Sequence, residues 1–218
     1  DGSCSICGWT FHRSEGVKEL MEPFIKHTGI VAPLDRADVD TDQIIPKQFL
    51  KRVERTGYGE YLFWDWRMNS DGTKRLNFVL NKSEYAGASI LVARDNFGCG
   101  SSREHAAWAL RDFGIRAVLA PSFADIFREN ADQNGIAAVE LSQEEIATIL
   151  HSAKSEAPLQ LTVDLEEQTV SNAEGVLASF RFDSFRRTCL LEGLDRIGLT
   201  LRNLNEIKAY EHIRWPEK

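Results

Sequence analysis

The chain has 218 residues, of which 43% are hydrophobic and 27% are charged, and its formal net charge is -7. This composition predicts a folded globular protein and excludes the disordered, collagen-like and low-complexity classes. The acidic balance argues against non-specific binding to nucleic acid or an anionic membrane, and no apolar run approaches the about 18 residues of a membrane helix. We therefore expect no nucleic-acid and no membrane partner, and any anionic ligand should be held by a local cluster of donors.

The first twenty residues differ in character from the rest of the chain. They precede Met21 and lack the apolar stretch of a secretory signal. We interpret residues 1–20 as a non-native or upstream extension and residues 21–218 as a single domain.

Four cysteines are too few for a disulfide scaffold at this length, which favours a reduced, cytoplasmic protein. Cys4 and Cys7 form a C-x-x-C pair, while Cys99 and Cys189 stand far apart. Because no second pair follows at zinc-finger spacing, we expect no metal site in this chain.

Strands and helices alternate through the middle of the chain. In chain order we expect a strand at 29–34, an acidic turn at 35–42, a strand at 88–93, a helix at about 102–112, a strand at 116–120, a helix from 121 to about 133, a strand at 136–141, a helix to about 153, three strands at 159–165, 168–171 and 176–182, and helices at about 184–191 and 203–213. The first group predicts parallel β-α-β units and the three later strands an antiparallel meander. The fold class is therefore α/β, with a mixed sheet and flanking helices.

A polar loop between an expected strand and helix is suited to anion binding. Gly98 and Gly100 let the backbone approach a ligand closely, and the N–H groups and dipole of the following helix favour negative charge. Arg103 offers a two-pronged contact to a carboxylate. The same residues fit a structural role, because Ser101 as N-cap and Glu104 three residues later form a capping box. The two interpretations are compatible, and both stay open.

Other readings of the motifs are weaker. A serine hydrolase elbow, G-x-S-x-G, is not met around Ser102, and no histidine is an obvious triad partner by spacing. The acidic segment 35–42 lacks the EF-hand pattern and favours a solvated turn. Cys99 fits a packing residue, and the aromatic group 58–66 fits a core or an interface.

The segment NFGCGSSREHAAW, residues 96–108, resembles the signature of the aconitase swivel domain. More closely, the chain is similar to the small subunits of 3-isopropylmalate dehydratases. Further segments that look like this family follow in its order, at 24–29, 38–50, 120–127 and 193–201. The resemblance covers about 22–212 and implies an aconitase-type swivelling β/β/α domain.

The resemblance also implies a reaction and a partner. Family members form half of a hydro-lyase that isomerises 2-isopropylmalate to 3-isopropylmalate in leucine biosynthesis, by removing water and adding it back. The substrate is a small dicarboxylate, and the partner is a separate large subunit that carries a [4Fe-4S] cluster. Because a cluster needs about three or four cysteine ligands and the chain has two beyond residue 20, we expect the cluster on the large subunit and no cofactor bound by this chain.

Roles for individual residues follow from the same resemblance. The first serine of the G-S-S-R-E motif, here Ser101, would be the catalytic base. Arg103 would bind a substrate carboxylate. The full set of substrate-binding residues implied is Gly100, Ser102, Arg103, Thr41, Asp42, Lys51 and Arg52. The gapped alignment leaves open whether Lys51, Arg52 or Arg55 contacts the substrate.

Two alternatives remain beside this interpretation. One is a related hydro-lyase acting on methylmalate, citraconate or a homoaconitate-type substrate, since loop-to-substrate rules cannot be read from one sequence. The other is a non-catalytic interaction module with the same fold. The intact Gly100–Arg103 set argues against the second, because such a module would not need a competent anion loop.

Overall fold

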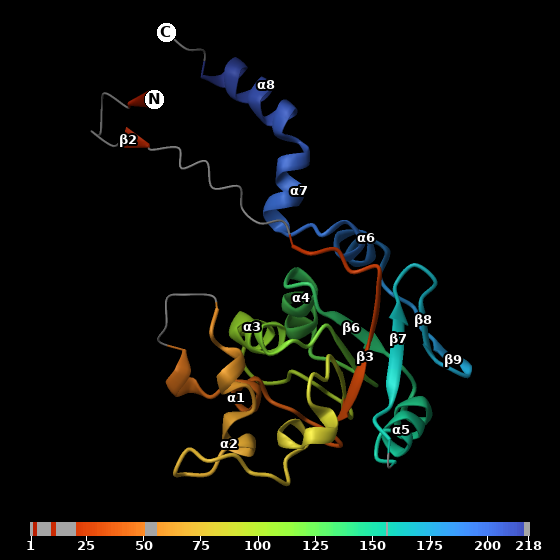
Figure 1. Ribbon diagram of the computed structural model, residues 1–218. Coiled ribbons are helices and arrows are strands. Elements are labelled where there is room, and N and C mark those ends of the chain that lie inside the picture. Colours follow the sequence, from red (N-terminus) through yellow and green to blue (C-terminus); the bar gives the residue numbers. More distant parts are fainter. Residues whose placement is uncertain (1, 4–9, 12–20, 51–55, 156, 216–218) are drawn as a thin grey trace.

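The computed structural model describes residues 2–3, 10–11, 21–50, 56–155 and 157–215 (Figure 1). Its strands are β1 (Gly2–Ser3), β2 (Thr10–Phe11), β3 (Lys26–Pro33), β4 (Ile90–Val92), β5 (Ala117–Ala120), β6 (Ala137–Glu140), β7 (Gln160–Asp164), β8 (Thr169–Asn172) and β9 (Gly175–Ser179). Its helices are α1 (Thr41–Ile44), α2 (Trp64–Arg67), α3 (Glu104–Phe113), α4 (Asp125–Gln133), α5 (Gln143–Ser152), α6 (Ser184–Glu192), α7 (Arg196–Arg202) and α8 (Leu204–Arg214).

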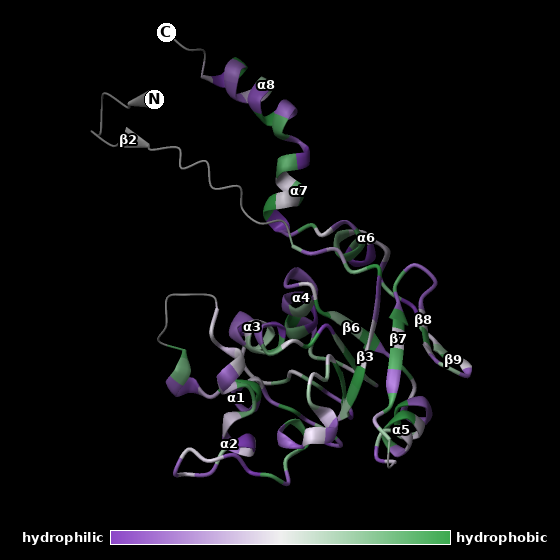
Figure 2. Cartoon of the chain, in the orientation of Figure 1, coloured by the Kyte–Doolittle hydropathy of each residue, from purple (hydrophilic) through white to green (hydrophobic). Residues whose placement is uncertain are grey.

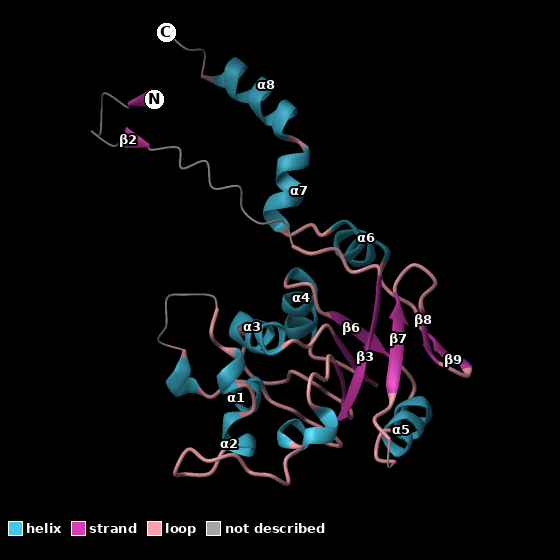
Figure 3. Ribbon diagram, viewed as in Figure 1, coloured by secondary structure: helices cyan, strands magenta, loops and turns pink. Residues whose placement is uncertain are grey.

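A mixed seven-stranded sheet organises the chain, in the order β6-β5-β4-β3-β7-β8-β9. Figure 3 shows strands of the sheet in magenta and the helices around them in cyan. Strands β3 to β6 pair in parallel, with α3 and α4 as the crossovers between β4, β5 and β6. Strands β7, β8 and β9 form an antiparallel meander that joins β3. The predicted α/β class, the parallel units and the meander are confirmed.

The parallel strands are buried on both faces, as expected for β-α-β units. Alternate side chains of β4 divide between two apolar clusters, because successive residues of a strand point to opposite faces. Leu91 lies in the cluster that includes α3, α4 and the aromatic segment with Tyr58 and Phe63, whereas Ile90 and Val92 lie in the cluster beneath α5 and α6. The prediction that the aromatic segment belongs to a core is confirmed for Tyr58 and Phe63, both fully buried.

Several helices begin or end at residues that typically cap helices. Ser142 and Glu145 form the capping box of α5, with Glu145 N donating to Ser142 Oγ at 3.2 Å. Asp183 caps α6, and Gly114 ends α3 in the left-handed conformation.

The predicted start of α3 is wrong. The helix begins at Glu104 with Arg103 as N-cap, so Ser101 and Glu104 do not form the capping box. Ser101 instead belongs to the preceding loop, where its carbonyl accepts a hydrogen bond from Thr41. Helix α4 likewise begins at Asp125 rather than Pro121, because Phe97 forms backbone hydrogen bonds with residues on both sides of Phe123.

The C-terminal helices leave the body of the molecule. Helix α6 packs against α4, while α7, which the sequence did not predict, and α8 extend away from the sheet (Figure 1). Among the helices of the described residues, none is both long and apolar enough to cross a membrane.

Candidate active site

A groove of about 310 Å³ lies beyond the carboxyl ends of β4 and β5. It is lined by residues of three segments, namely Thr41, Gly98, Gly100, Ser101, Ser102, Arg103, Ala124, Asp125, Ile126 and Phe127. Ligand sites of open α/β sheets lie in this position, because loops from adjacent parallel strands meet there. The groove therefore brings together five of the residues predicted for the site, from chain segments about 60 residues apart.

Backbone hydrogen bonds hold these loops side by side. Gly98 N donates to Val39 O at 2.8 Å, and Thr41 N donates to Cys99 O at 2.8 Å. On the other side, Phe97 N donates to Ser122 O at 3.0 Å. The segments that follow β3, β4 and β5 thus lie side by side in the same order as the strands themselves. This arrangement fixes the position of the loop that carries Ser101.

Two glycines of the loop are required by the packing around them. Gly98 has a φ of 79°, and a Cβ there would overlap the ring of Phe127. Gly100 has a φ of 90°, and a Cβ there would overlap the carboxylate of Asp40. Glycine adopts these left-handed angles without steric cost and leaves the space empty. The backbone can therefore lie directly against α4 on one side and α1 on the other.

Ser101 and Ser102 are exposed at the groove, whereas Thr41 beneath them is 1% exposed. The Thr41 hydroxyl donates to Ser101 O at 2.9 Å and lies 3.5 Å from Ser101 Oγ. A buried threonine thus anchors the backbone of Ser101 while the Ser101 side chain stays accessible. The contact gives Thr41 a positioning role toward Ser101.

Asp42 links two cations at the groove. Arg103 Nη1 donates to Asp42 Oδ1, and Lys47 Nζ lies 3.1 Å from Asp42 Oδ2. The Arg103 side chain is 19% exposed, so its guanidinium is held in place rather than freely solvated. The pair orients one face of Arg103 while its other donors remain for a ligand, since a guanidinium carries five N–H groups.

The acidic segment before α1 is a hydrogen-bonded turn, as predicted. Asp40 caps α1 and accepts from Asp42 N at 2.6 Å, and Gln43 completes a capping box. Asp38 accepts from Asn96 Nδ2 at 2.8 Å.

The structure disfavours the hydrolase alternative. The described side-chain contact of Ser101 Oγ is Thr41, and the ring of His105 lies against Tyr58 and Trp108 instead. Burial lowers the pKa of His105. Cys99 lies beside the groove loop, and burial, aided by Asp40 and Asp38, raises the pKa of its thiol. A thiol with a raised pKa is a poor nucleophile, which favours the packing interpretation of Cys99.

The described residues do not fit an iron–sulfur cluster. Among them no group of three or more His, Cys, Asp or Glu side chains is arranged to hold a metal ion. Cys99 lies in the groove loop and Cys189 in α6, while Cys4 and Cys7 lie outside the described residues.

Some predicted site residues stay untested, and others were missed. Lys51, Arg52 and Arg55 lie outside the described residues, so their roles remain predictions. The wall formed by Ala124–Phe127 was not predicted as part of the site. The signal for it was present, because these residues belong to one of the family-like segments and follow a strand parallel to β4.

The fold and the groove define a domain of the aconitase type. Residues 21–144 match the family model of the aconitase C-terminal domain. Two curated relatives, both 3-isopropylmalate dehydratase small subunits, are similar over 191 residues: the Brevibacillus brevis protein is 56% identical and the Koribacter versatilis protein 58% identical, each covering 88% of this chain and 98% of the relative. A solved 3-isopropylmalate dehydratase structure from Methanocaldococcus jannaschii, 26% identical, superposes with a TM-score of 0.60 over 85% of this chain and 99% of that one. The chain belongs to the family of 3-isopropylmalate dehydratase small subunits.

Proposed function

We propose that this chain is the small subunit of a 3-isopropylmalate dehydratase and supplies one side of its active site. The reaction converts 2-isopropylmalate to 3-isopropylmalate by dehydration and rehydration, a step of leucine biosynthesis. The observation that carries the proposal is the groove in which Ser101, Arg103 and Thr41 meet, formed by the family's signature loop. Residues 21–218 would form one domain in this enzyme.

Ser101 is the proposed general base, which takes a proton from the carbon next to a substrate carboxylate. A serine hydroxyl is a weak base, so its deprotonated form needs electrostatic support. Arg103 lines the same groove, and α3 begins at Glu104, so its positive N-terminal end lies close to Ser101 in the chain. Both features stabilise negative charge at this point of the groove.

Arg103 is proposed to bind a carboxylate of the substrate, with Ser102 and the Gly100 backbone beside it. One carboxylate oxygen of Asp42 accepts from the guanidinium, and the other pairs with Lys47. Because the carboxylate of Asp42 is already engaged by two cations, we assign it to orienting Arg103. Thr41 is assigned to placing Ser101.

The large subunit is the proposed partner that completes the site. The small-subunit names of the relatives imply a larger companion chain. We place the [4Fe-4S] cluster on that chain. The cluster would act there as a Lewis acid on the departing hydroxyl. The described residues of this chain supply a base and a carboxylate-binding group, but no cluster ligand set.

Reconstitution tests the proposal. The chain is mixed anaerobically with a large subunit of the family, and formation of 3-isopropylmalate from 2-isopropylmalate is measured. Neither subunit alone should turn over substrate, and the mixture should. Citraconate, methylmalate and a homoaconitate-type substrate serve as comparisons. Faster turnover of one of these would assign the chain to a related hydro-lyase, and assembly without any turnover would leave an interaction module.

A further inference from the structure

The C-terminal helices form an arm, residues 196–215, that projects from the body (Figure 1). Large apolar side chains are exposed along it, with exposed fractions of 38–80%: Ile197, Leu201, Leu204, Tyr210, Ile213 and Trp215. Every residue of the 11-residue helix α8 is at least partly exposed. Isolated helices shorter than about 12–15 residues are marginal in water, so α8 needs packing from another surface.

Helix α7 contacts the body of the molecule through two ion pairs. Arg196 pairs with Glu129 of α4, and Arg202 pairs with Glu192 of α6. Ile197 and Leu201, which are one helical turn apart, remain 49% and 52% exposed. The ion-paired residues of α7 thus lie toward the body, and an apolar stripe lies on the other face of the helix. Figure 2 shows hydrophobic bands on α7 and at the start of α8.

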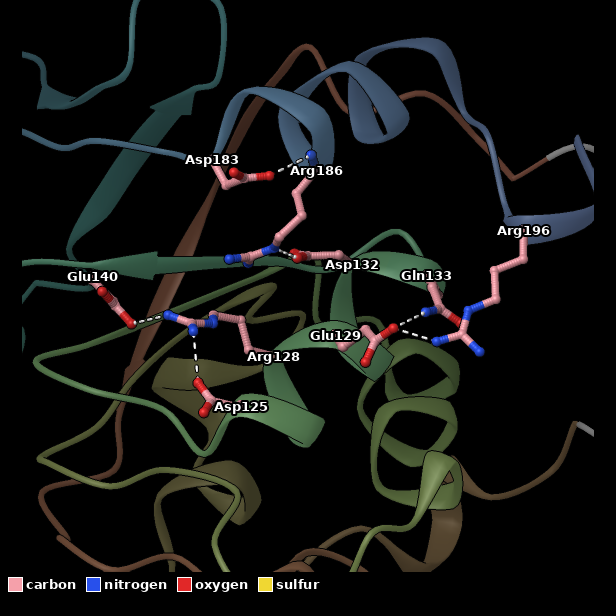
Figure 4. Close-up of polar contacts among 9 residues, drawn as sticks. All are labelled: Asp125, Arg128, Glu129, Asp132, Gln133, Glu140, Asp183, Arg186 and Arg196. Carbon is pink, nitrogen blue, oxygen red and sulfur yellow. Dashed lines mark hydrogen bonds and ion pairs between the residues drawn. The ribbon is translucent and has the colours of Figure 1, made fainter. Parts of the chain in front are cut away.

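A groove of about 550 Å³ lies at the base of the arm, between α4, α6 and α7. Its arginines pair with acidic side chains (Figure 4): Arg128 with Asp125 and Glu140, Arg186 with Asp132, and Arg196 with Glu129. Its walls include Phe185, Leu194 and Leu199, and Phe185 is 62% exposed. With its charges paired internally, the groove presents an apolar surface suited to a protein partner.

This groove and the one that holds Ser101 share one lining residue. Asp125, the first residue of α4, lines both. A chain that covers the Ser101 groove therefore reaches the base of the arm by following α4 across the surface. The family context supplies the occupant, because small subunits of a dehydratase assemble with a large one.

We propose that the arm and the groove at its base are a docking surface for the large subunit. The proposal rests on the proposed function and adds to it where the partner is held. The large subunit would close the Ser101 groove with one part of its surface and bury Ile197 and Leu201 with another. The core of a protein interface is depleted of charged residues, so single charges on this stripe should weaken assembly.

The test compares the affinity of three full-length variants for the large subunit by calorimetric titration. Leu201→Glu and Ile197→Glu place a charge on the stripe, and each should raise Kd at least tenfold. Val176→Glu is the matched control, since Val176 is 65% exposed in β9, at the far edge of the sheet, and should leave Kd within about twofold. Thermal unfolding of each chain alone verifies that the variants are folded.

The outcomes separate this proposal from the one it rests on. A wild-type chain that neither binds the large subunit nor supports turnover overturns the proposed function and the docking surface with it. A wild-type chain that assembles and turns over, with stripe variants that bind equally well, overturns the docking surface alone. A third outcome is that the chain forms a dimer and that Leu201→Glu dissociates this dimer without changing Kd for the large subunit. This outcome would assign the arm to self-association and would also overturn the docking surface.

Discussion

Helix α4 borders two grooves that use polar groups in different ways. At its N-terminal end, Ala124–Phe127 face a loop whose serines are exposed. Toward its C-terminal end, Asp132 is 6% exposed and pairs with Arg186, and the arginines nearby are paired as well. Charges that are paired within the chain hold helices together, whereas accessible hydroxyls on a glycine-rich loop are available to a ligand. The density of charged side chains alone therefore does not mark the groove that we propose for catalysis.

The largest effect is expected from Ser101→Ala. Loss of a general base should lower kcat of the assembled enzyme about a thousandfold. Because Ser101 is exposed, the free energy of unfolding of the chain should change by less than about 0.5 kcal/mol. Steady-state kinetics and urea unfolding measure the two effects, with Ser152→Ala, an exposed serine at the end of α5, as the control. If kcat of the Ser101→Ala enzyme is within threefold of the wild-type value, Ser101 is not the general base.

A pair of glycine variants tests how tightly the loop packs on α4. Gly98 and Gly72 have φ of 79° and 81°, but an added Cβ meets Phe127 at Gly98 and nothing within 4 Å at Gly72. Gly72→Ala should lower the free energy of unfolding by about 1 kcal/mol from backbone strain alone. Gly98→Ala should lower the free energy of unfolding by about 2 kcal/mol more than Gly72→Ala does, because overpacking adds to that strain. Equal losses in urea unfolding would show that the contact with Phe127 is not constraining.

A smaller effect is expected from Asp42→Asn. The variant removes the negative charge that orients Arg103, so KM for isopropylmalate should rise about tenfold, or about 1.4 kcal/mol, with a smaller change in kcat. Lys47→Gln is the control, because Lys47 is 70% exposed and exposed ion pairs contribute little. If the two variants raise KM equally, Asp42 does not act through Arg103.

The last prediction concerns the pH dependence of stability and Asp132. Burial raises the pKa of Asp132 to about 7, with Arg186 opposing the rise. The unfolded carboxyl titrates near 3.9, so between about pH 4 and pH 7 the folded chain holds a proton that the unfolded chain has released, and stability from this group falls as pH rises. The free energy of unfolding of wild type relative to Asp132→Asn should therefore fall by about 1–3 kcal/mol from pH 5 to pH 7. Urea unfolding at each pH measures this difference between the two chains. A difference that does not change with pH would contradict the raised pKa of Asp132.

Much of the fold could be predicted because its signals are local. Apolar runs of strand length mark β4, β5 and β6, and a serine with a glutamate three residues on marks the start of α5. The loop with Gly98 and Gly100 could be selected as a candidate site because glycines between a strand and a helix let the backbone approach a ligand closely, and the structure places this loop at a groove.

The remainder depends on contacts between distant residues. The start of α3 was misplaced because Ser101 is held by Thr41, 60 positions earlier, rather than by its own helix. The ion pair of Asp42 with Arg103 spans 61 positions and has no local signature. Helix α7 was missed because it has only 7 residues with Gly198 among them, and it is held by ion pairs to α4 and α6.

We propose that the groove with Ser101 performs the chemistry and that the groove at the base of the arm holds the partner. Titrating the large subunit into wild type, Ser101→Ala and Leu201→Glu while measuring both assembly and turnover tests it directly. Ser101→Ala should assemble with the wild-type Kd and lose turnover at every concentration, whereas Leu201→Glu should assemble at least tenfold more weakly and regain wild-type kcat at saturation. Loss of assembly in Ser101→Ala, or of kcat at saturation in Leu201→Glu, would contradict the division.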